Sequence, residues 1–153
     1  MVSHFGKIII NEHDNSINRQ ELGKIVFSDK NELSKLESIV WPEIGKMVMA
    51  KVEECGSDDI VILDAALLIE AGWYGLCNEV WVCVLKRAEQ VKRIVERDGG
   101  KGVDEEMAGK RLDNQIQDED RFEFANVVLS TEWEEKFTQA QCEKAWGELR
   151  DRL

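Results

Sequence analysis

Short apolar runs alternate along the chain with stretches whose apolar residues follow helical spacing. The three runs occupy residues 60–63, 80–85 and 126–129, and Asp59 and Asp64 bound the first. Short apolar runs of this kind are typical of strands buried on both faces of a parallel sheet. Helical patterns flank the runs. We therefore expect an α/β protein whose parallel sheet has helices on both faces.

The predicted helices begin at residues that commonly cap helix N-termini. Asn18 precedes a helix expected over residues 19–27, and Asp29 precedes a second helix. Trp41-Pro42 should end this second helix, because proline disfavours helical conformation in the residue before it. Pro42 then suits the first turn of another helix that runs to about residue 55.

The second half of the chain carries four more helical patterns, over residues 88–98, 104–115, 118–124 and 133–150. Gly99-Gly100 ends the first of them, and a loop is expected to lead to a cap at Asp104. At the N-terminus, residues 1–10 follow no clear pattern. Residues 11–16 contain no apolar side chain and are expected to form a loop.

Length and charge limit the class of protein. With 153 residues, the chain suits one compact domain. Twenty basic and 31 acidic residues give a net charge of −11, which argues against nucleic acid and anionic membranes as partners because phosphate groups repel such a surface. No apolar run approaches the roughly 20 residues of a membrane-spanning helix, and the N-terminus does not resemble a secretion signal. We expect a cytoplasmic protein without membrane insertion, with mitochondrial association as an alternative.

Cysteine and histidine give little support to metal or thiol chemistry. No cysteines form a CxxC pair, and none has a histidine at zinc-finger spacing; the four are Cys55, Cys77, Cys83 and Cys142. Both histidines lie near the N-terminus in polar surroundings, which disfavours a Cys–His enzyme. Cys83 lies in an apolar run and is expected in the core.

Asp64 directly follows the apolar run 60–63. A strand that ends in a carboxylate places it at the C-terminal edge of the sheet, where open α/β sheets bind ligands. Such a carboxylate can help to hold Mg²⁺ on a nucleotide. The alternative is that Asp64 caps the turn after the strand, a common role for aspartate, and the pattern alone favours this cap.

Three arginines gather around a glycine-rich stretch. Arg93 and Arg97 lie four residues apart on one predicted helix, Gly99-Gly100 follow, and Arg111 lies on the next helix. A helical hairpin hinged at glycines can close over phosphates, to which guanidinium groups offer fork-shaped donors. Pairing with neighbouring carboxylates on the surface is an equally supported alternative; the candidates are Glu89, Glu96, Glu105 and Glu106.

Several motifs resemble those of the dephospho-coenzyme A kinases. The principal one runs from Asp64 as Asp-Ala-Ala-Leu-Leu-Ile-Glu-Ala-Gly-Trp-x-x-Leu, and Glu79-Val-Trp follows it. Further matching motifs start at Ile17, Leu36, Arg93, Arg111, Val127 and Thr138. The resemblance covers nearly the whole chain in order. It is nearest to the kinase domain of animal-type bifunctional coenzyme A synthase.

The resemblance implies ATP-dependent phosphorylation of the ribose 3′-hydroxyl of dephospho-coenzyme A, the last step of coenzyme A synthesis. Its cofactors would be ATP and Mg²⁺, and its ligands dephospho-coenzyme A or coenzyme A. The resemblance assigns residues 1–56 to a substrate-side helical region, 57–98 and 125–153 to the core, and 99–124 to a lid. For catalysis the resemblance implies Asp64 and Arg111, and it places Asp64 near the metal. The residues that it implies for nucleotide binding are Arg93, Arg97, Arg111 and Ser130. Those that it implies for substrate binding are Arg19, Leu67, Leu68 and Glu70.

The phosphate-binding motif of that family does not occur in the chain. The family uses G-x-x-x-x-G-K-[ST], whereas none of the five Gly-Lys pairs here is followed by Ser or Thr. The chain resembles a P-loop kinase without its N-terminal strand–P-loop–helix–strand unit, which also carries the Asp that activates the substrate hydroxyl. In the family the P-loop strand lies between the runs 60–63 and 80–85. Without it these runs should keep unpaired edges or pair with each other.

Three hypotheses for function follow. The first is a truncated dephospho-coenzyme A kinase domain, single and incomplete over residues 1–153, that is inactive alone. The second is a non-catalytic module, derived from the kinase, that binds coenzyme A or dephospho-coenzyme A. The third is an interaction protein that binds a partner, such as a full-length copy of itself, through the exposed sheet edge or the acidic surface. We adopt the first.

Overall fold

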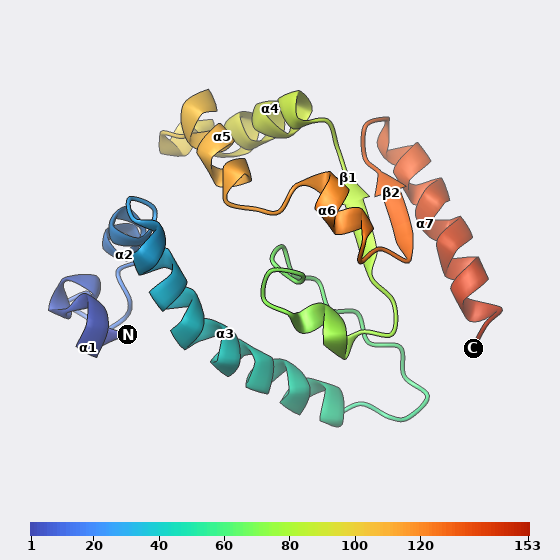
Figure 1. Ribbon diagram of the computed structural model, residues 1–153, viewed down its shortest axis with the longest axis horizontal. Helices are drawn as coiled ribbons and strands as arrows, with labels where there is room; N and C mark the ends of the chain where they lie inside the picture. Colours follow the sequence, from blue (N-terminus) through green and yellow to red (C-terminus); the bar gives the residue numbers. More distant parts are fainter. The chain divides into compact units, whose positions relative to one another are not determined.

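The computed structural model describes residues 1–153, apart from the side chain of Lys101. The chain divides into two compact units, Met1–Ile62 and Leu63–Leu153 (Figure 1). In the part of the chain so described, no helix is both long enough and apolar enough to cross a membrane. The two units are taken in turn.

The first unit is helical. Its elements are α1 (Val2–Phe5), η1 (Lys7–Ile9), α2 (Arg19–Val26) and α3 (Lys30–Glu53). Ile9, which is fully buried, packs with Phe5, Leu22 and Val26. Three apolar side chains of α3 lie half-buried against this cluster, namely Leu33, Leu36 and Ile39. The N-terminal stretch without a clear pattern therefore supplies two of the four buried residues of this core.

Local signals predicted the start of α2 and of α3 correctly. The Asn18 side chain accepts a hydrogen bond from the Glu21 amide at 3.1 Å. Asp29 likewise accepts from the Asn31 amide at 2.8 Å. These bonds satisfy amides that have no partner inside the helix. The loop expected over residues 11–16 is also confirmed, and its ends meet in an antiparallel bridge between Ile10 and Ile17.

The predicted break at Trp41-Pro42 is wrong. Helix α3 runs without interruption from Lys30 to Glu53, with Pro42 inside it. Proline has no amide hydrogen, so the carbonyl of Ser38, four residues earlier, loses its helical donor. Ser38 and Pro42 are both exposed. Water can therefore hydrate the freed carbonyl, so the helix continues across the proline.

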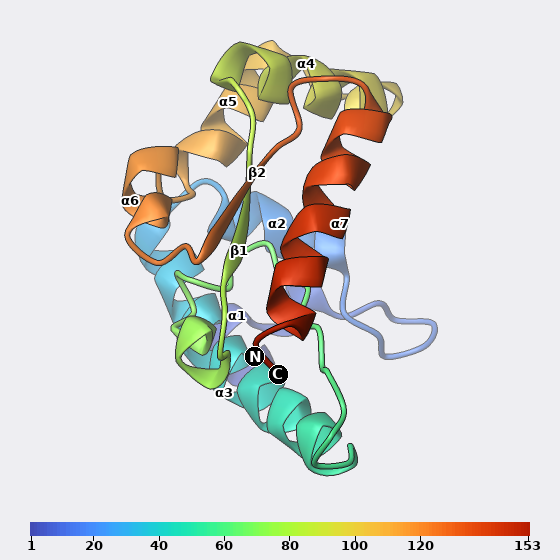
Figure 2. The same ribbon diagram turned by 90° about the vertical axis from the view of Figure 1, so that its right-hand side faces the viewer.

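The second unit contains a two-stranded parallel sheet, with Trp81 beside Val127 and Val84 beside Ser130 (Figure 2). Its strands are β1 (Trp81–Val84) and β2 (Val127–Ser130). Its helices are η2 (Trp73–Leu76), α4 (Arg87–Asp98), η3 (Gly99–Lys101), α5 (Glu105–Asp113), α6 (Asp118–Phe122) and α7 (Glu135–Arg150). The expected α/β class and parallel pairing are confirmed, and α4, α5, α6 and α7 agree with the four predicted helices to within a few residues. The short helices η2 and η3 were not predicted.

The buried residues of the second unit lie at the sheet and also in α4, α5 and the connection between them. Val82 of β1, Leu129 of β2 and Ala145 of α7 are buried, and α7 packs against β2. At the start of the ladder, the Asn126 side chain accepts from the Val80 amide at 2.8 Å, and the Val80 carbonyl accepts from the Asn126 amide at 2.9 Å. This reciprocal pair sets the register of the two strands.

The strand predicted over residues 60–63 is absent. Ile60, Val61 and Ile62 are 45%, 48% and 78% exposed, and the described chain contains no strand that pairs with them. Extended apolar residues become a strand only when a neighbouring strand satisfies their backbone groups. The runs 60–63 and 80–85 therefore do not pair with each other. Cys83, expected in the core, is also exposed, because the two-stranded sheet leaves part of its surface uncovered.

Replacing Pro42 by alanine should stabilise α3. The new amide can donate to the Ser38 carbonyl, so we expect the free energy of unfolding to rise by about 1–3 kcal/mol, after allowing for the greater entropy of the unfolded chain. Urea unfolding followed by helical circular dichroism measures this change. Glu43→Ala, at the next exposed position, is the control and should shift stability by less than about 0.5 kcal/mol. A Pro42→Ala protein no more stable than this control would contradict the explanation.

Candidate functional site

Helices α4 and α5 form a hairpin, in which they lie side by side (Figure 1). The connection contains η3 and then Gly102, whose φ of 81° lies in the left-handed region that glycine adopts without strain. Val103 is buried after this turn. The Asp104 side chain accepts from the Met107 amide at 2.8 Å, which confirms the predicted cap of α5.

Arg97 and Arg111 meet at one buried carboxylate. Nη2 of Arg97 and Nη1 of Arg111 each lie 2.9 Å from Oδ2 of Asp98. Asp98, at the end of α4, is only 9% exposed. The hydrogen bond from Arg97 to Asp98 raises the pKa of the guanidinium, because the carboxylate stabilises its charged form. The structure thus brings together two of the three predicted arginines, and it adds a carboxylate that the sequence analysis did not single out.

The third arginine, Arg93, has a different environment. Its Nη2 donates to the carbonyl of Thr131 at 2.9 Å, and its Nε lies 3.3 Å from Glu89. Thr131 directly follows β2, and its amide donates to the Val84 carbonyl of β1 at 3.0 Å. Arg93 therefore links α4 to the C-terminal end of the sheet. Of the carboxylates considered as surface partners, Glu89 pairs with Arg93 and Glu106 pairs with Lys110.

Asp64 is exposed, and the described residues donate no hydrogen bond to its carboxylate, so a capping role has no support. Although the Cys83 side chain is exposed, partial desolvation by its neighbours on β1 raises the pKa of its thiol, and the nearby Cys142 and Asp64 raise it further. A carboxylate disfavours a neighbouring thiolate, so Asp64 lies within electrostatic range of the sheet. Among the described residues, no three or more His, Cys, Asp or Glu side chains gather to hold a metal ion.

The segment after Asp64 forms consecutive turns. The Leu67 carbonyl accepts from the Ala71 amide at 2.9 Å, and the Leu68 carbonyl accepts from the Trp73 amide at 2.9 Å. Leu67, Leu68 and Glu70 are half-buried. Glu70 accepts from the Ile116 amide at 3.2 Å, which joins this segment to the turn between α5 and α6.

Ser130, at the end of β2, is held by the C-terminal helix. Oε1 of Gln141 accepts from the Ser130 amide at 3.0 Å, while Nε2 of Gln141 donates to the Ser130 carbonyl at 2.9 Å. Thr138 donates to the same carbonyl at 3.2 Å. The Gln141 amide thus replaces the hydrogen bonds of an adjacent strand. The sequence analysis placed Gln141 in the motif that starts at Thr138 but gave it no role, because only tertiary packing brings it to Ser130.

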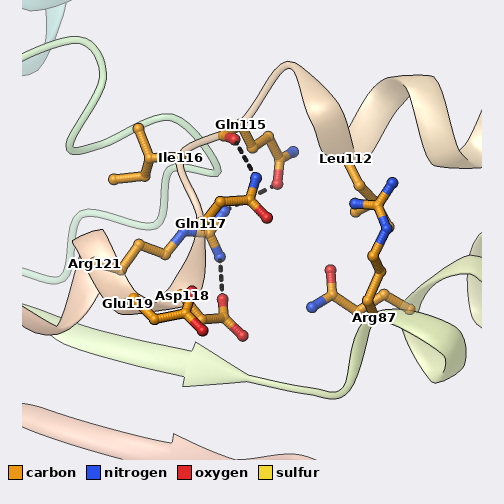
Figure 3. Close-up of a pocket in the computed structure, with 9 residues that line it drawn as sticks. Arg87, Leu112, Gln115, Ile116, Gln117, Asp118, Glu119 and Arg121 are labelled. Carbon is orange, nitrogen blue, oxygen red and sulfur yellow. Dashed lines mark hydrogen bonds and ion pairs between the residues drawn. The ribbon is translucent and has the colours of Figure 1, made fainter.

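A polar recess lies between the start of α4 and the turn from α5 to α6 (Figure 3). Its two arginines are already paired: Arg121 donates to Gln115 at 3.0 Å, and Arg87 lies 2.6 Å from Asp113. The recess has a volume of about 140 Å³. Pockets for drug-sized ligands occupy roughly 300–1,000 Å³, so this recess is too small to hold a whole nucleotide. Its lining residues are Arg87, Gln90, Leu112, Gln115, Ile116, Gln117, Asp118, Glu119 and Arg121.

The parallel sheet, the helices around it and the arginine-bearing α4–α5 hairpin define an α/β protein. Comparison with known proteins is more specific. The sequence pattern of the family described as dephospho-CoA kinase matches residues 1–136. The chain belongs to the dephospho-CoA kinase family.

Curated relatives agree with this assignment. The chain is 33% identical over 152 residues to a dephospho-CoA kinase of Syntrophus aciditrophicus, a match that covers 97% of this chain and 63% of the relative. It is 36% identical over 143 residues to a dephospho-CoA kinase of Carboxydothermus hydrogenoformans, covering 92% and 68%. The chain thus spans about two thirds of the length of these relatives.

Solved structures show the same fold. The protein TT1252 from Thermus thermophilus superposes with a TM-score of 0.72 at 23% identity, covering 97% of this chain and 74% of that one. A dephospho-CoA kinase from Campylobacter jejuni gives a TM-score of 0.66 at 24% identity, covering 99% and 75%.

Gln141→Leu should destabilise the end of β2. The amide of Ser130 loses its acceptor and its carbonyl loses a donor, so we expect the free energy of unfolding to fall by about 1–3 kcal/mol. Urea unfolding reports the global change, and amide hydrogen exchange at Ser130 reports the local one.

Gln139→Leu is a matched control on the same helix, because Gln139 is exposed and donates only to Glu143. It should change stability by less than about 0.5 kcal/mol. Equal effects of the two substitutions would show that Gln141 has no special role at Ser130.

Proposed function

We propose that this chain forms the substrate-binding and arginine-bearing part of a dephospho-CoA kinase. That enzyme phosphorylates the ribose 3′-hydroxyl of dephospho-CoA with ATP, the last step of coenzyme A synthesis. The observation that carries the proposal is the convergence of Arg97 and Arg111 at the glycine-containing end of the α4–α5 hairpin. Guanidinium groups bind phosphate oxygens through two parallel hydrogen bonds, and their charge does not titrate near neutral pH.

We give the site residues the roles that the family resemblance implies. Arg97 and Arg111 bind phosphate oxygens, and Arg111 stabilises the charge that develops during transfer. Ser130 contacts the nucleotide from the end of β2. Arg93 acts on the nucleotide side by fixing the loop that begins at Thr131. On the substrate side we assign Arg19, Leu67, Leu68 and Glu70.

Bound ATP would supply the phosphoryl group, and Mg²⁺ would neutralise part of its charge. Asp64 fits one metal ligand, because its carboxylate is exposed and accepts no hydrogen bond from the described residues. Mg²⁺ usually takes one or two carboxylates and completes its coordination with water and phosphate oxygens. One carboxylate at the sheet therefore suffices for the proposed role.

In our proposal, different segments of the chain have different roles in the kinase. Residues 1–56 recognise substrate, 57–98 with 125–153 form the core, and 99–124 form the lid. The motifs also favour a specific likeness to the kinase domain of animal-type bifunctional coenzyme A synthase. We also propose a cytoplasmic location.

Phosphoryl transfer also needs a phosphate cradle, and the 153 residues contain no G-x-x-x-x-G-K-[ST] motif. We propose that these residues do not turn over alone. A second candidate function is a non-catalytic module that binds dephospho-CoA or coenzyme A. The outer edge of β1, which has no strand partner in the described chain, favours self-association of such a module.

Coenzyme A formation from ATP and dephospho-CoA tests the first proposal. Losing even one transition-state hydrogen-bond donor costs about 2.7–4 kcal/mol, so a chain without the whole cradle should form no detectable product. The assay uses the chain at high concentration after its mass has been verified. Turnover that Arg111→Ala abolishes would contradict the requirement for the cradle, and turnover that this variant leaves unchanged would indicate a contaminating enzyme.

Binding of dephospho-CoA tests the substrate side. Arg19, the first residue of α2, is exposed, and no described side chain pairs with it. If it binds a phosphate of the substrate, Arg19→Ala should remove about 1.5–3 kcal/mol of binding free energy, which calorimetry measures as a weaker Kd.

Lys24→Ala is the matched control, because it removes the same charge from the same helix while Lys24 pairs with Glu21. A similar loss for both variants would indicate a general charge effect and would contradict a specific role of Arg19. No binding by the unsubstituted chain would contradict both candidate functions that need dephospho-CoA.

A further inference from the structure

Asp98 is a buried acid whose two arginine partners are exposed. It is 9% exposed, whereas the Arg97 and Arg111 side chains are 70% and 43% exposed. Both guanidinium groups approach the same oxygen, Oδ2, at 2.9 Å. Arg97 precedes Asp98 directly in α4, while Arg111 comes from α5, thirteen residues after Asp98. The carboxylate therefore joins the two helices at the end where the glycines lie.

Two guanidinium groups repel each other unless an anion lies between them. Asp98 supplies that anion from inside the protein, so the two arginines stay together in the ligand-free chain. Each guanidinium has five N–H donors, and the bond to Oδ2 uses one of them on each arginine. Their exposed surfaces can still donate to an outside anion.

We propose that Asp98 is a positioning residue that orders Arg97 and Arg111 for a polyphosphate. The inference rests on the proposed function, because it deepens the role assigned to the two arginines. Without Asp98 they would separate, and a polyphosphate would have to order both long side chains itself. Each ordered side chain costs about 0.5–1.5 kcal/mol of binding free energy. Arg97 and Arg111 avoid that cost when Asp98 already holds them in place.

The other end of the hairpin offers a matched comparison. There Asp113 of α5 lies 2.6 Å from Nη2 of Arg87 in α4, and Arg87 also donates to the Gly109 carbonyl at 3.3 Å. This pair also joins α4 to α5 through a carboxylate and an arginine. Its aspartate is exposed, however, and contacts neither Arg97 nor Arg111. Asp113→Asn therefore changes net charge as Asp98→Asn does, but leaves the two arginines in place.

The direction in which Asp98→Asn changes anion affinity distinguishes a positioning role of Asp98 from simple repulsion by its charge. Removing a negative charge beside a phosphate site strengthens anion binding if the charge only repels the ligand. If Asp98 positions the arginines, Asp98→Asn weakens binding although the site becomes more positive. We expect a loss of about tenfold in the affinity for inorganic tripolyphosphate, in line with the ordering cost of one to two side chains. Asp98→Glu should bind with intermediate affinity.

Calorimetric titration of tripolyphosphate into the full chain and its Asp98→Asn, Asp98→Glu and Asp113→Asn variants measures this effect. Circular dichroism defines a temperature at which all four proteins are folded. Weaker binding by Asp98→Asn, together with unchanged or tighter binding by Asp113→Asn, would support positioning. Equal or tighter binding by Asp98→Asn would overturn it, because a purely structural aspartate affects unfolding and not the affinity of the folded chain.

Solvent exchange of the guanidinium N–H signals of Arg97 and Arg111, measured by NMR, tests the same inference without a ligand. Exchange should be slower in the unsubstituted chain than in Asp98→Asn, and equal rates would overturn the inference. If the unsubstituted chain binds no tripolyphosphate, the phosphate-binding role in the proposed function fails. The exchange rates then still decide whether Asp98 orders the two arginines.

Discussion

The parallel ladder between β1 and β2 is the constraint on which the second unit depends. Its N-terminal end is set by the reciprocal bonds of Val80 and Asn126. At its C-terminal end, the Val84 carbonyl accepts from the amide and the hydroxyl of Thr131. Arg93 then binds the Thr131 carbonyl from α4. The α4–α5 hairpin and the end of β2 therefore keep a defined relation, which an isolated pair of short strands could not provide.

In this small sheet, side chains make some of the hydrogen bonds that neighbouring strands make in a larger sheet. Gln141 satisfies both backbone groups of Ser130, and Asn126 satisfies the amide of Val80. A buried backbone group without a partner costs about as much as a lost hydrogen bond. The side-chain amides of Gln141 and Asn126 therefore leave these backbone groups at the ends of the strands with hydrogen-bond partners. The outer edge of β1 has no such cover among the described residues.

The ion pairs on the protein surface differ from the ion pairing at Asp98 in the α4–α5 hairpin. Many exposed pairs, such as Lys46 with Glu43 and Lys110 with Glu106, lie within single helices, and such pairs contribute about 0–1 kcal/mol each. The pairing at Asp98 joins two helices, and its carboxylate is buried. In a chain of net charge −11, this arrangement concentrates positive charge at one point of an otherwise acidic protein.

Local interactions and the parallel pairing of β1 with β2 were predictable from the sequence, whereas most long-range side-chain contacts were not. The caps at Asn18, Asp29 and Asp104 followed from the residues within four positions of each, and the helices of the second unit followed from their periodicity. The break at Pro42 was wrong because an exposed helix can hydrate the freed carbonyl. The strand at residues 60–63 was wrong because a strand exists only beside another strand. The sequence alone thus determined the family and the arginine-bearing hairpin. Only the tertiary structure decided that Asp98 binds Arg111 and that Gln141 holds Ser130, since these contacts join residues 13 and 11 positions apart along the chain.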